Sequence, residues 1–195
     1  MAKLIMPLLS IGASGKIGDA LVFFPWKGIK CVRKYVIPAN PKTAGQQAQR
    51  SKLTAAVDQY HLTAFENQDI TALRRYASIQ SKPMSQFNIF CREHIKAAAD
   101  GKEFHAFWGE STSNIQSTSM TVAAKSDEGL TDPNIRWGYS ATFMPTVVSC
   151  TETAGNYMAS IVDATPGTIL YFQFFDTGGA EAGISGIYTE KTKAA

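Results

Sequence analysis

The chain has 195 residues, of which 45% are hydrophobic and 18% charged, with a formal net charge of +3. This composition excludes an intrinsically disordered protein, and the length is sufficient to bury a core in one domain or two small ones. The longest apolar run near the start, residues 4–11, is interrupted by Pro7 and Ser10. Neither a signal peptide nor a membrane span is therefore expected, and a cytosolic site of synthesis follows as an expectation.

The net charge conceals an asymmetry along the chain. Through Glu103 there are 15 Lys and Arg against 7 Asp and Glu, or +8, whereas from Phe104 onward there are 4 against 9, or −5. Fields of opposite sign attract different partners, so we expect two regions with different neighbours.

A β-hairpin is predicted near the N-terminus. Residues 20–26 and 29–36 are apolar runs rich in β-branched and aromatic side chains, and Lys27-Gly28 separates them. Such a spacing is typical of a two-residue hairpin turn in which Gly takes positive φ. The apolar residues 1–13 are expected to form an extended arm that pairs with or packs beside this hairpin.

A rigid exit follows the hairpin. Pro38, Asn40 and Pro41 prevent further ladder hydrogen bonds, because proline lacks an amide hydrogen and restricts the preceding residue. Thr43 is the predicted N-cap of the helix that follows. The unit is thus hairpin, proline corner and helix.

These residues also carry a family resemblance. The order SGKIG at residues 14–18, a short hairpin ending in Arg or Lys, NPKT at 40–43 and QQxQR at 46–50 resembles a family of small proteins encoded in tailed phages and prophages, usually beside virion genes. The resemblance implies a structural protein of the virion, most plausibly an auxiliary or decoration capsid protein present in many copies. A neck, tail or fibre-attachment protein is the close rival. The implied partners are the major capsid protein, portal, neck or tail proteins, and further copies of the chain.

Three helices are predicted between residues 43 and 101. Apolar and long side chains recur at helical spacing in each. The first helix runs to about His61, the second is short, and the third starts near Pro83 and stops at Gly101. The expected stripes are Gln46, Arg50, Leu53, Val57 and Tyr60 in the first; Ile70, Leu73, Tyr76 and Ala77 in the second; and Phe87, Phe90, Cys91, Ile95 and Ala98 in the third.

After Phe104 helical periodicity disappears and short strand-like runs alternate with turn-rich segments. The expected strands are residues 119–123, 135–143, 157–162, 169–175 and 184–189. This spacing indicates a β-sandwich. The segment from Thr165 to the end resembles the last hairpin of a fibronectin type III or related immunoglobulin-like domain, with Trp137 as the core tryptophan and Tyr171 as the corner tyrosine.

The predicted fold is therefore α+β. A hairpin plus helical domain occupies residues 1–103, a linker residues 104–118, and an immunoglobulin-like β-sandwich residues 119–195. Phe104, Phe107 and Trp108 are too apolar for a solvated linker and are expected to pin one domain to the other or to a partner. The segment from about Thr112 onward is expected to fold alone.

No nucleotide site is predicted, although the chain contains Gly15-Lys16. A phosphate-binding loop needs glycine where Ser10 stands and a hydroxyl where Ile17 stands. It also needs a helix next, whereas a strand pattern follows. The glycines are better explained as turn residues.

No enzyme, cofactor or metal site is predicted. Cys91 and His94 are three residues apart on a helix, but a second pair of ligands at metal spacing is absent from the sequence. No serine, cysteine or carboxylate can be joined to a base and an orienting partner. The three cysteines, Cys31, Cys91 and Cys150, are odd in number and widely spaced, which favours reduced thiols.

The candidate site is a partner-binding surface on the hairpin and the start of the first helix. Strand alternation is expected to send Lys30 and Lys34 to one face and Phe23, Cys31 and Arg33 elsewhere. Nucleic acid, held through phosphate contacts and base stacking, is the alternative partner, while an acidic protein surface is favoured. The candidate residues are Phe24, Trp26, Lys27, Lys30, Arg33, Lys34 and Arg50.

Overall fold

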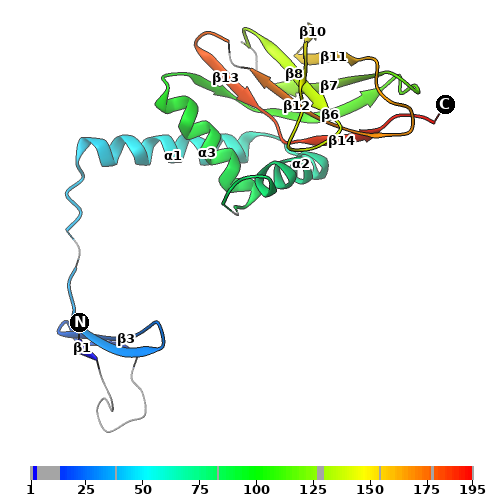
Figure 1. The fold of residues 1–195 in the computed structure, drawn as a ribbon. Coiled ribbons are helices and arrows are strands. Elements are labelled where there is room, and N and C mark those ends of the chain that lie inside the picture. The colour runs from blue at the N-terminus through cyan, green and yellow to red at the C-terminus, as the bar shows by residue number, and fades with distance from the viewer. Residues whose placement is uncertain are drawn as a thin grey trace. The chain divides into compact units, whose positions relative to one another are not determined.

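The computed structural model describes the backbone of residues 2–3 and, in full, residues 14–37, 39–82, 84–126, 130–153, 155–176 and 178–194. The chain forms two units, residues 1–43 and residues 44–195, and each is described by itself (Figure 1). The predicted apolar run 4–11, the rest of the arm to residue 13, Pro38 and Pro83 lie outside the described residues.

The first unit is a small antiparallel sheet. Its strands are β1 (Ala2–Lys3), β2 (Gly15–Ile17), β3 (Leu21–Trp26) and β4 (Ile29–Lys34), in the order β1-β4-β3-β2. Lys27 and Gly28 connect β3 to β4 with φ angles of 47° and 78°. Two consecutive positive φ values are the signature of a type I′ turn, so the predicted two-residue hairpin is confirmed. The pairing of β1 with β4 agrees with the expected arm, while β2 was not predicted.

The second unit begins with three helices, as predicted: α1 (Ala44–Leu62), α2 (Asn67–Ser78) and α3 (Gln86–Ala99). Glu66 and Asp69 form a capping box at the start of α2, and the Ser85 side chain accepts from the amide of Asn88 at the start of α3. Gly101, with φ of 74°, follows α3 as the expected stop. Among the described residues, no helix has both the length and the apolar character that a membrane crossing requires.

The predicted stripe of α1 is wrong in its first half. Gln46 and Arg50 are exposed, Leu53 is 47% exposed, and Ala56 is the residue of this helix that is buried. The aromatic contacts of α1 lie near its end, where Tyr60 packs against Phe87 and Phe90 of α3 and against Phe65 of the connection to α2. The predicted stripes of α2 and α3 are confirmed at Leu73, Tyr76, Ala77, Phe90 and Cys91, which are buried.

The remaining strands form two packed sheets. They are β5 (Glu103–His105), β6 (Phe107–Ser113), β7 (Met120–Ser126), β8 (Pro133–Gly138), β9 (Thr146–Ser149), β10 (Thr151–Thr153), β11 (Asn156–Ile161), β12 (Ile169–Asp176), β13 (Glu181–Ile184) and β14 (Tyr188–Lys191). One sheet has the order β10-β11-β7-β6; the other has β5-β13-β12-β8-β9, with β14 also paired to β12. If strands β6 to β12 are lettered A, B, C, C′, D, E and F, and β13 with β14 form strand G, the two sheets have the A-B-E-D and C′-C-F-G orders of immunoglobulin-like sandwiches.

The core lies between the two sheets. Phe107, Ile135, Tyr157, Phe172 and Phe174 are at most 1% exposed. The expected core tryptophan, Trp137, is buried here as well. Tyr171 instead packs on the helix side of the second sheet, against the cluster of Leu73, Tyr76, Ile89 and Ile187. The tyrosine that bonds across the fold is Tyr188, whose hydroxyl donates to Asp69.

The division of the last strand accommodates helix α2. Gly186 lies between β13 and β14, and a Cβ there would overlap the backbone of Ala72 and Leu73. The Ile187 amide donates to the carbonyl of Ala72 at 3.0 Å, and the Arg75 guanidinium donates to the Ile187 carbonyl. Figure 1 shows α2 running beside β14. Glycine is required because only a missing side chain allows helix and strand backbones to approach so closely.

The predicted linker at 104–118 is therefore wrong, as is the boundary after residue 103. Residues 103–105 and 107–113 are strands β5 and β6, and Phe104 and Phe107 are 6% and 1% exposed. The helices pack on the sandwich instead of forming a domain with the hairpin. Serine, threonine and glycine in this segment suggested a linker, but they belong to an edge strand that bulges between Trp108 and Ser111.

Candidate functional site

The hairpin register decides which candidate side chains share a face. Residues directly opposite each other in an antiparallel pair project to the same side. One face carries the pairs Trp26 with Ile29, Phe24 with Cys31, and Val22 with Arg33; the other carries Pro25 with Lys30, Phe23 with Val32, and Leu21 with Lys34. The prediction is confirmed for Lys30, Lys34, Cys31 and Arg33, but Phe23 lies on the lysine face.

Both faces of this sheet expose apolar side chains. Trp26 and Ile29, which pair at the last rung before the turn, are 53% and 42% exposed, and Ile17 and Leu21 are 46% and 41% exposed. Within the described part of the first unit, the only buried side chains are Phe23 and Cys31. A sheet normally needs one covered face to be stable, so this sheet is suited to burial against a partner.

Cations lie against the aromatic side chains of the sheet. The Arg33 guanidinium is 5.3 Å from the centre of the Phe24 ring, and Lys16 Nζ is 4.2 Å from that of Tyr35. Lys16 also forms an ion pair with Asp19 at 2.7 Å. These contacts hold Arg33 and Lys16 locally, whereas Lys27 stands exposed in the turn.

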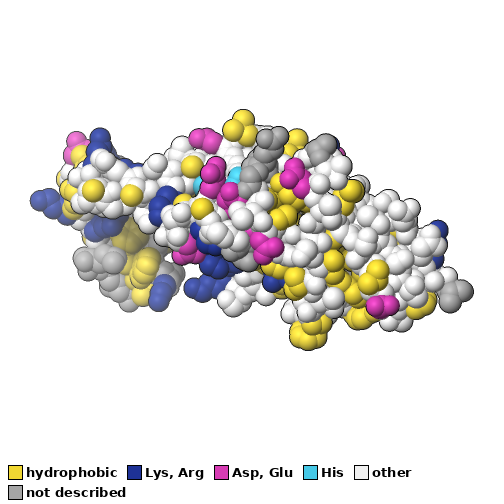
Figure 2. Space-filling view, turned by 90° about the horizontal axis from the view of Figure 1, so that it is seen from above, with side chains coloured by type: hydrophobic (Ala, Val, Ile, Leu, Met, Phe, Trp, Pro, Cys, Tyr) yellow, Lys and Arg dark blue, Asp and Glu magenta, His cyan; other side chains and the backbone are white. Residues whose placement is uncertain are grey.

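The structure brings together six of the seven predicted residues, those of the hairpin, but divides them between its faces and its turn. Arg50 is an exposed residue of α1 in the second unit and is not placed with the others. Figure 2 shows that carboxylates gather over one part of the surface and that apolar side chains emerge in several patches.

The sites rejected from sequence remain unsupported. Within the described residues, no group of three or more His, Cys, Asp or Glu side chains is arranged to hold a metal ion. The three cysteines are free, as predicted. Burial raises the pKa of Cys91, and that of Cys150 to about 12, so neither thiol is activated as a nucleophile. Burial lowers the pKa of His94. Lys16 is followed by strand β3 and not by a helix.

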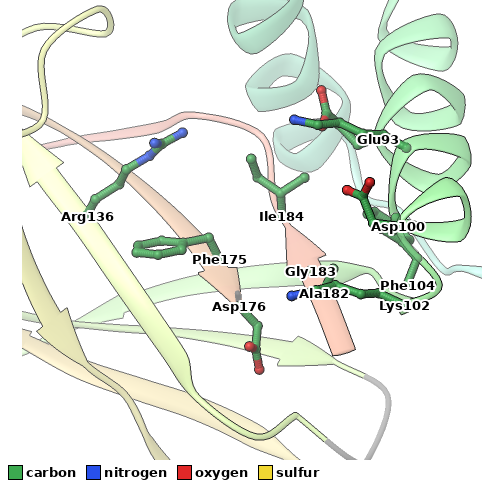
Figure 3. A pocket seen from close by; sticks show the side chains of 12 residues that line it. Glu93, Asp100, Lys102, Phe104, Arg136, Phe175, Asp176, Ala182, Gly183 and Ile184 are labelled. Carbon is green, nitrogen blue, oxygen red and sulfur yellow. The ribbon is translucent and has the colours of Figure 1, made fainter. Parts of the chain in front are cut away.

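The second unit contains a hollow of about 300 Å³ that the sequence did not indicate. It lies between α3 and the second sheet, with Phe175 and Ile184 between side chains of α3 on one side and Arg136 on the other (Figure 3). Gln173, which is fully buried, accepts two hydrogen bonds from Arg136, and the Phe175 ring lies 5.7 Å from the guanidinium. The remaining charged side chains that line it are Glu93, Lys96, Asp100, Lys102 and Asp176.

A buried polar cluster joins α2 to the edge of the sandwich. Asp69, 1% exposed, accepts from the Tyr188 hydroxyl at 2.6 Å and from the amides of Glu66 and Gly109. Glu110 lies close by; burial, followed by the charges of Glu190 and Asp69, raises its pKa from 4.5 to about 7. In the sequence, Glu66 and Asp69 at capping-box spacing were a signal for one half of the cluster.

Comparison with known proteins finds only distant likeness to solved structures. No family model and no curated protein matches the sequence. Among solved structures, the chain is similar to a computer-redesigned β-sandwich protein, with 14% identity over 46% of this chain and 95% of that one and a TM-score of 0.38. It is similar to the FN1–FN3 domains of chicken CNTN1, with 14% identity over 45% of this chain and 32% of that one and a TM-score of 0.38. It is also similar to the FN5 domain of Drosophila Lar, with 14% identity over 46% of this chain and 97% of that one and a TM-score of 0.36. No function follows from likeness at this level.

Proposed function

We propose that this chain is a structural, non-enzymatic protein of a tailed phage particle. Its most plausible place is that of an auxiliary or decoration protein that binds the capsid or neighbouring subunits in many copies in the virion. A neck, tail or fibre-attachment position is the close alternative. The family resemblance of residues 14–50 motivates the proposal.

The observation that supports it is the exposure of apolar side chains on both faces of the N-terminal sheet, among the residues that the structure describes. Trp26 and Ile29 form an exposed apolar pair, and large aromatic side chains are typical anchors of protein interfaces. Lys27 in the turn and Lys30 beside it supply positive charge that favours an acidic protein surface. The second unit, with its own core, remains available to project or to contact adjacent subunits.

Nucleic-acid binding is the alternative of another class, because four cations and Trp26 lie on one hairpin. The structure gives this alternative less support, since Lys30 and Lys34 are on one face, Arg33 is on the other, and Arg33 lies against Phe24. The described cations of the strands are divided between the faces: Lys16 and Arg33, both opposite Val22, lie on one face, where Lys16 pairs with Asp19, and Lys30 and Lys34 lie on the other.

Incorporation into particles tests the proposal. Trp26→Ala is expected to abolish incorporation while circular dichroism still reports a folded second unit. Amides of residues 14–37 should exchange with deuterium much faster in the isolated protein than in the particle, because partners supply the missing burial. A cryo-electron microscopy map in which this sheet faces no other protein would contradict the proposal. Binding to DNA that falls steeply as salt increases would favour the nucleic-acid alternative.

A further inference from the structure

The two units carry opposite charge. Residues 1–43 contain 7 Lys and Arg against 1 Asp, or +6, and residues 44–195 contain 12 against 15, or −3. The segment from Phe104 onward, which includes all of the sandwich strands except the first residue of β5, accounts for −5. Opposite fields of this size attract the first unit of one molecule to the second unit of another.

The basic partner of such a contact is the hairpin tip, which we define as Trp26, Lys27, Ile29 and Lys30. Of the three tryptophans in the chain, Trp137 is buried and Trp108 partly buried, so Trp26 is the exposed one. The turn places Lys27 directly beside it. The tip therefore carries a large flat apolar anchor, one ammonium group beside it in the turn and a second, that of Lys30, on the opposite face of the hairpin.

The acidic partner is one end of the sandwich, at which neighbouring elements together contribute five carboxylates. We call this surface the acidic end. Glu103 and Glu181 are directly adjacent in the parallel pair of β5 and β13, an arrangement that is unfavourable without a nearby cation. Glu181 also accepts from the hydroxyl of Thr131, and the Asp132 amide donates to Asp176. The acidic end consists of Asp100, Glu103, Asp132 and Glu181 at the surface and of buried Asp176, which accepts from the backbone amides of Asp132 and Gly178.

The hollow beside the acidic end suits an aromatic anchor. Phe104, Phe175 and Ile184 give it apolar walls, and Asp100 and Asp176 belong to both the hollow and the acidic end. Arg136 is held by Gln173 with its guanidinium near the Phe175 ring. Such a fixed, planar cation at an apolar wall is a favourable neighbour for an indole ring. Lys96 and Lys102 offset part of the acidic charge.

We propose that the hairpin tip of one copy docks on the acidic end of a second copy, with Trp26 in the hollow and Lys27 and Lys30 facing the carboxylates. This inference rests on the proposed function and names a partner for the same docking surface. The contact joins different surfaces of the two molecules, so it is heterologous and produces rings or filaments. Multi-copy assembly then needs no additional interface.

Sedimentation of the full chain over a range of concentrations tests the anchor. The wild-type protein is expected to self-associate, more weakly at high salt, and Trp26→Ala to weaken association about tenfold or more. Phe143→Ala is the matched control, because Phe143 is an aromatic residue that is 69% exposed elsewhere on the sandwich. A wild-type protein that stays monomeric, or equal effects of both substitutions, would overturn the inference.

A charge exchange tests the pairing of the two surfaces. Lys27→Glu with Lys30→Glu makes an acidic tip, and Glu103→Lys with Glu181→Lys reverses the acidic end. Neither double variant should associate alone, whereas an equimolar mixture should, because the reversed tip of one fits the reversed end of the other. Lys82→Glu with Lys125→Glu changes the net charge as much as the tip variant does, at exposed sites elsewhere, and should associate like wild type.

The outcomes separate this inference from the proposed function. A folded mixture that remains monomeric refutes docking between copies. If Trp26→Ala is nevertheless lost from particles, the sheet docks on a different virion protein and the proposed function stands. If the mixture associates but the chain enters no particle, the contact between copies is supported and the phage assignment fails.

Discussion

Replacement of Glu110 by Gln should change the pH dependence of stability in a defined direction. The carboxyl lies at the junction of β6, α2 and β14, and its Oε1 has no hydrogen-bond partner among the described residues. Burial raises its pKa to about 7, with the charges of Glu190 and Asp69 adding to the effect. The folded protein thus holds a proton that the unfolded chain releases near pH 4.5.

The sign and size of the effect follow from linkage. A carboxyl with a raised folded-state pKa contributes stability that is fully present below pH 4.5 and is lost as the pH rises through about 7. A difference of about 2.5 pH units corresponds to at most about 3.4 kcal/mol. Because Glu110 is only half-buried, solvent screening reduces this, and we expect about 1–2 kcal/mol.

Urea unfolding followed by tryptophan fluorescence between pH 4.5 and 8.5 measures this difference. Glu110→Gln should match the wild type near pH 4.5 and exceed its free energy of unfolding by about 1–2 kcal/mol at pH 8. Glu152→Gln, on the exposed edge strand β10, is the control and should leave the pH profile unchanged. Parallel profiles of wild type and Glu110→Gln would refute the reasoning.

Three further predictions concern single side chains. Tyr188→Phe removes the hydroxyl that donates to buried Asp69, so chemical denaturation should show a loss of about 1.5–3 kcal/mol, with the fold retained by circular dichroism. Gly186→Ala should cost about 3 kcal/mol or more, because the added methyl overlaps the backbone of Ala72, and an unchanged melting temperature would contradict the observed close approach. Calorimetry should detect no magnesium-dependent ATP binding, and micromolar binding that is lost in Lys16→Ala would contradict this.

Local patterns made the hairpin and the helices predictable. The Lys27-Gly28 turn depends on two neighbouring residues, and the stripes of α2 and α3 depend on spacing within one helix. The same reasoning failed for the first half of α1, because spacing alone does not tell whether a helix has a neighbour to cover it. Sequence patterns report the periodicity of an element, whereas burial depends on what packs against it.

The contacts that join helices to sandwich were beyond this reasoning. Asp69 and Tyr188 are 119 residues apart in the chain, and the approach of Gly186 to Ala72 is similarly distant. Neither Asp69 nor Gly186 is conspicuous in the sequence, since an aspartate in the first turn of a helix and a glycine in a Gly-rich hairpin are both common. The hollow beside Arg136 likewise arises from α3 and strands β5, β8, β12 and β13, so only the folded chain shows it.

These contacts reverse the expected behaviour of the C-terminal segment. A chain beginning at Thr112 lacks α2, α3, β5 and most of β6. Tyr188 and Ile187 therefore lose their partners on α2, and the sheet β10-β11-β7-β6 loses its edge strand β6. Residues 44–195 keep all of them, and we expect that segment to melt cooperatively while residues 112–195 do not. Circular dichroism and calorimetry of the two segments provide the comparison. A cooperative melt of residues 112–195 as an all-β protein would mean that the helices are an accessory layer and that the sandwich is independent of Asp69.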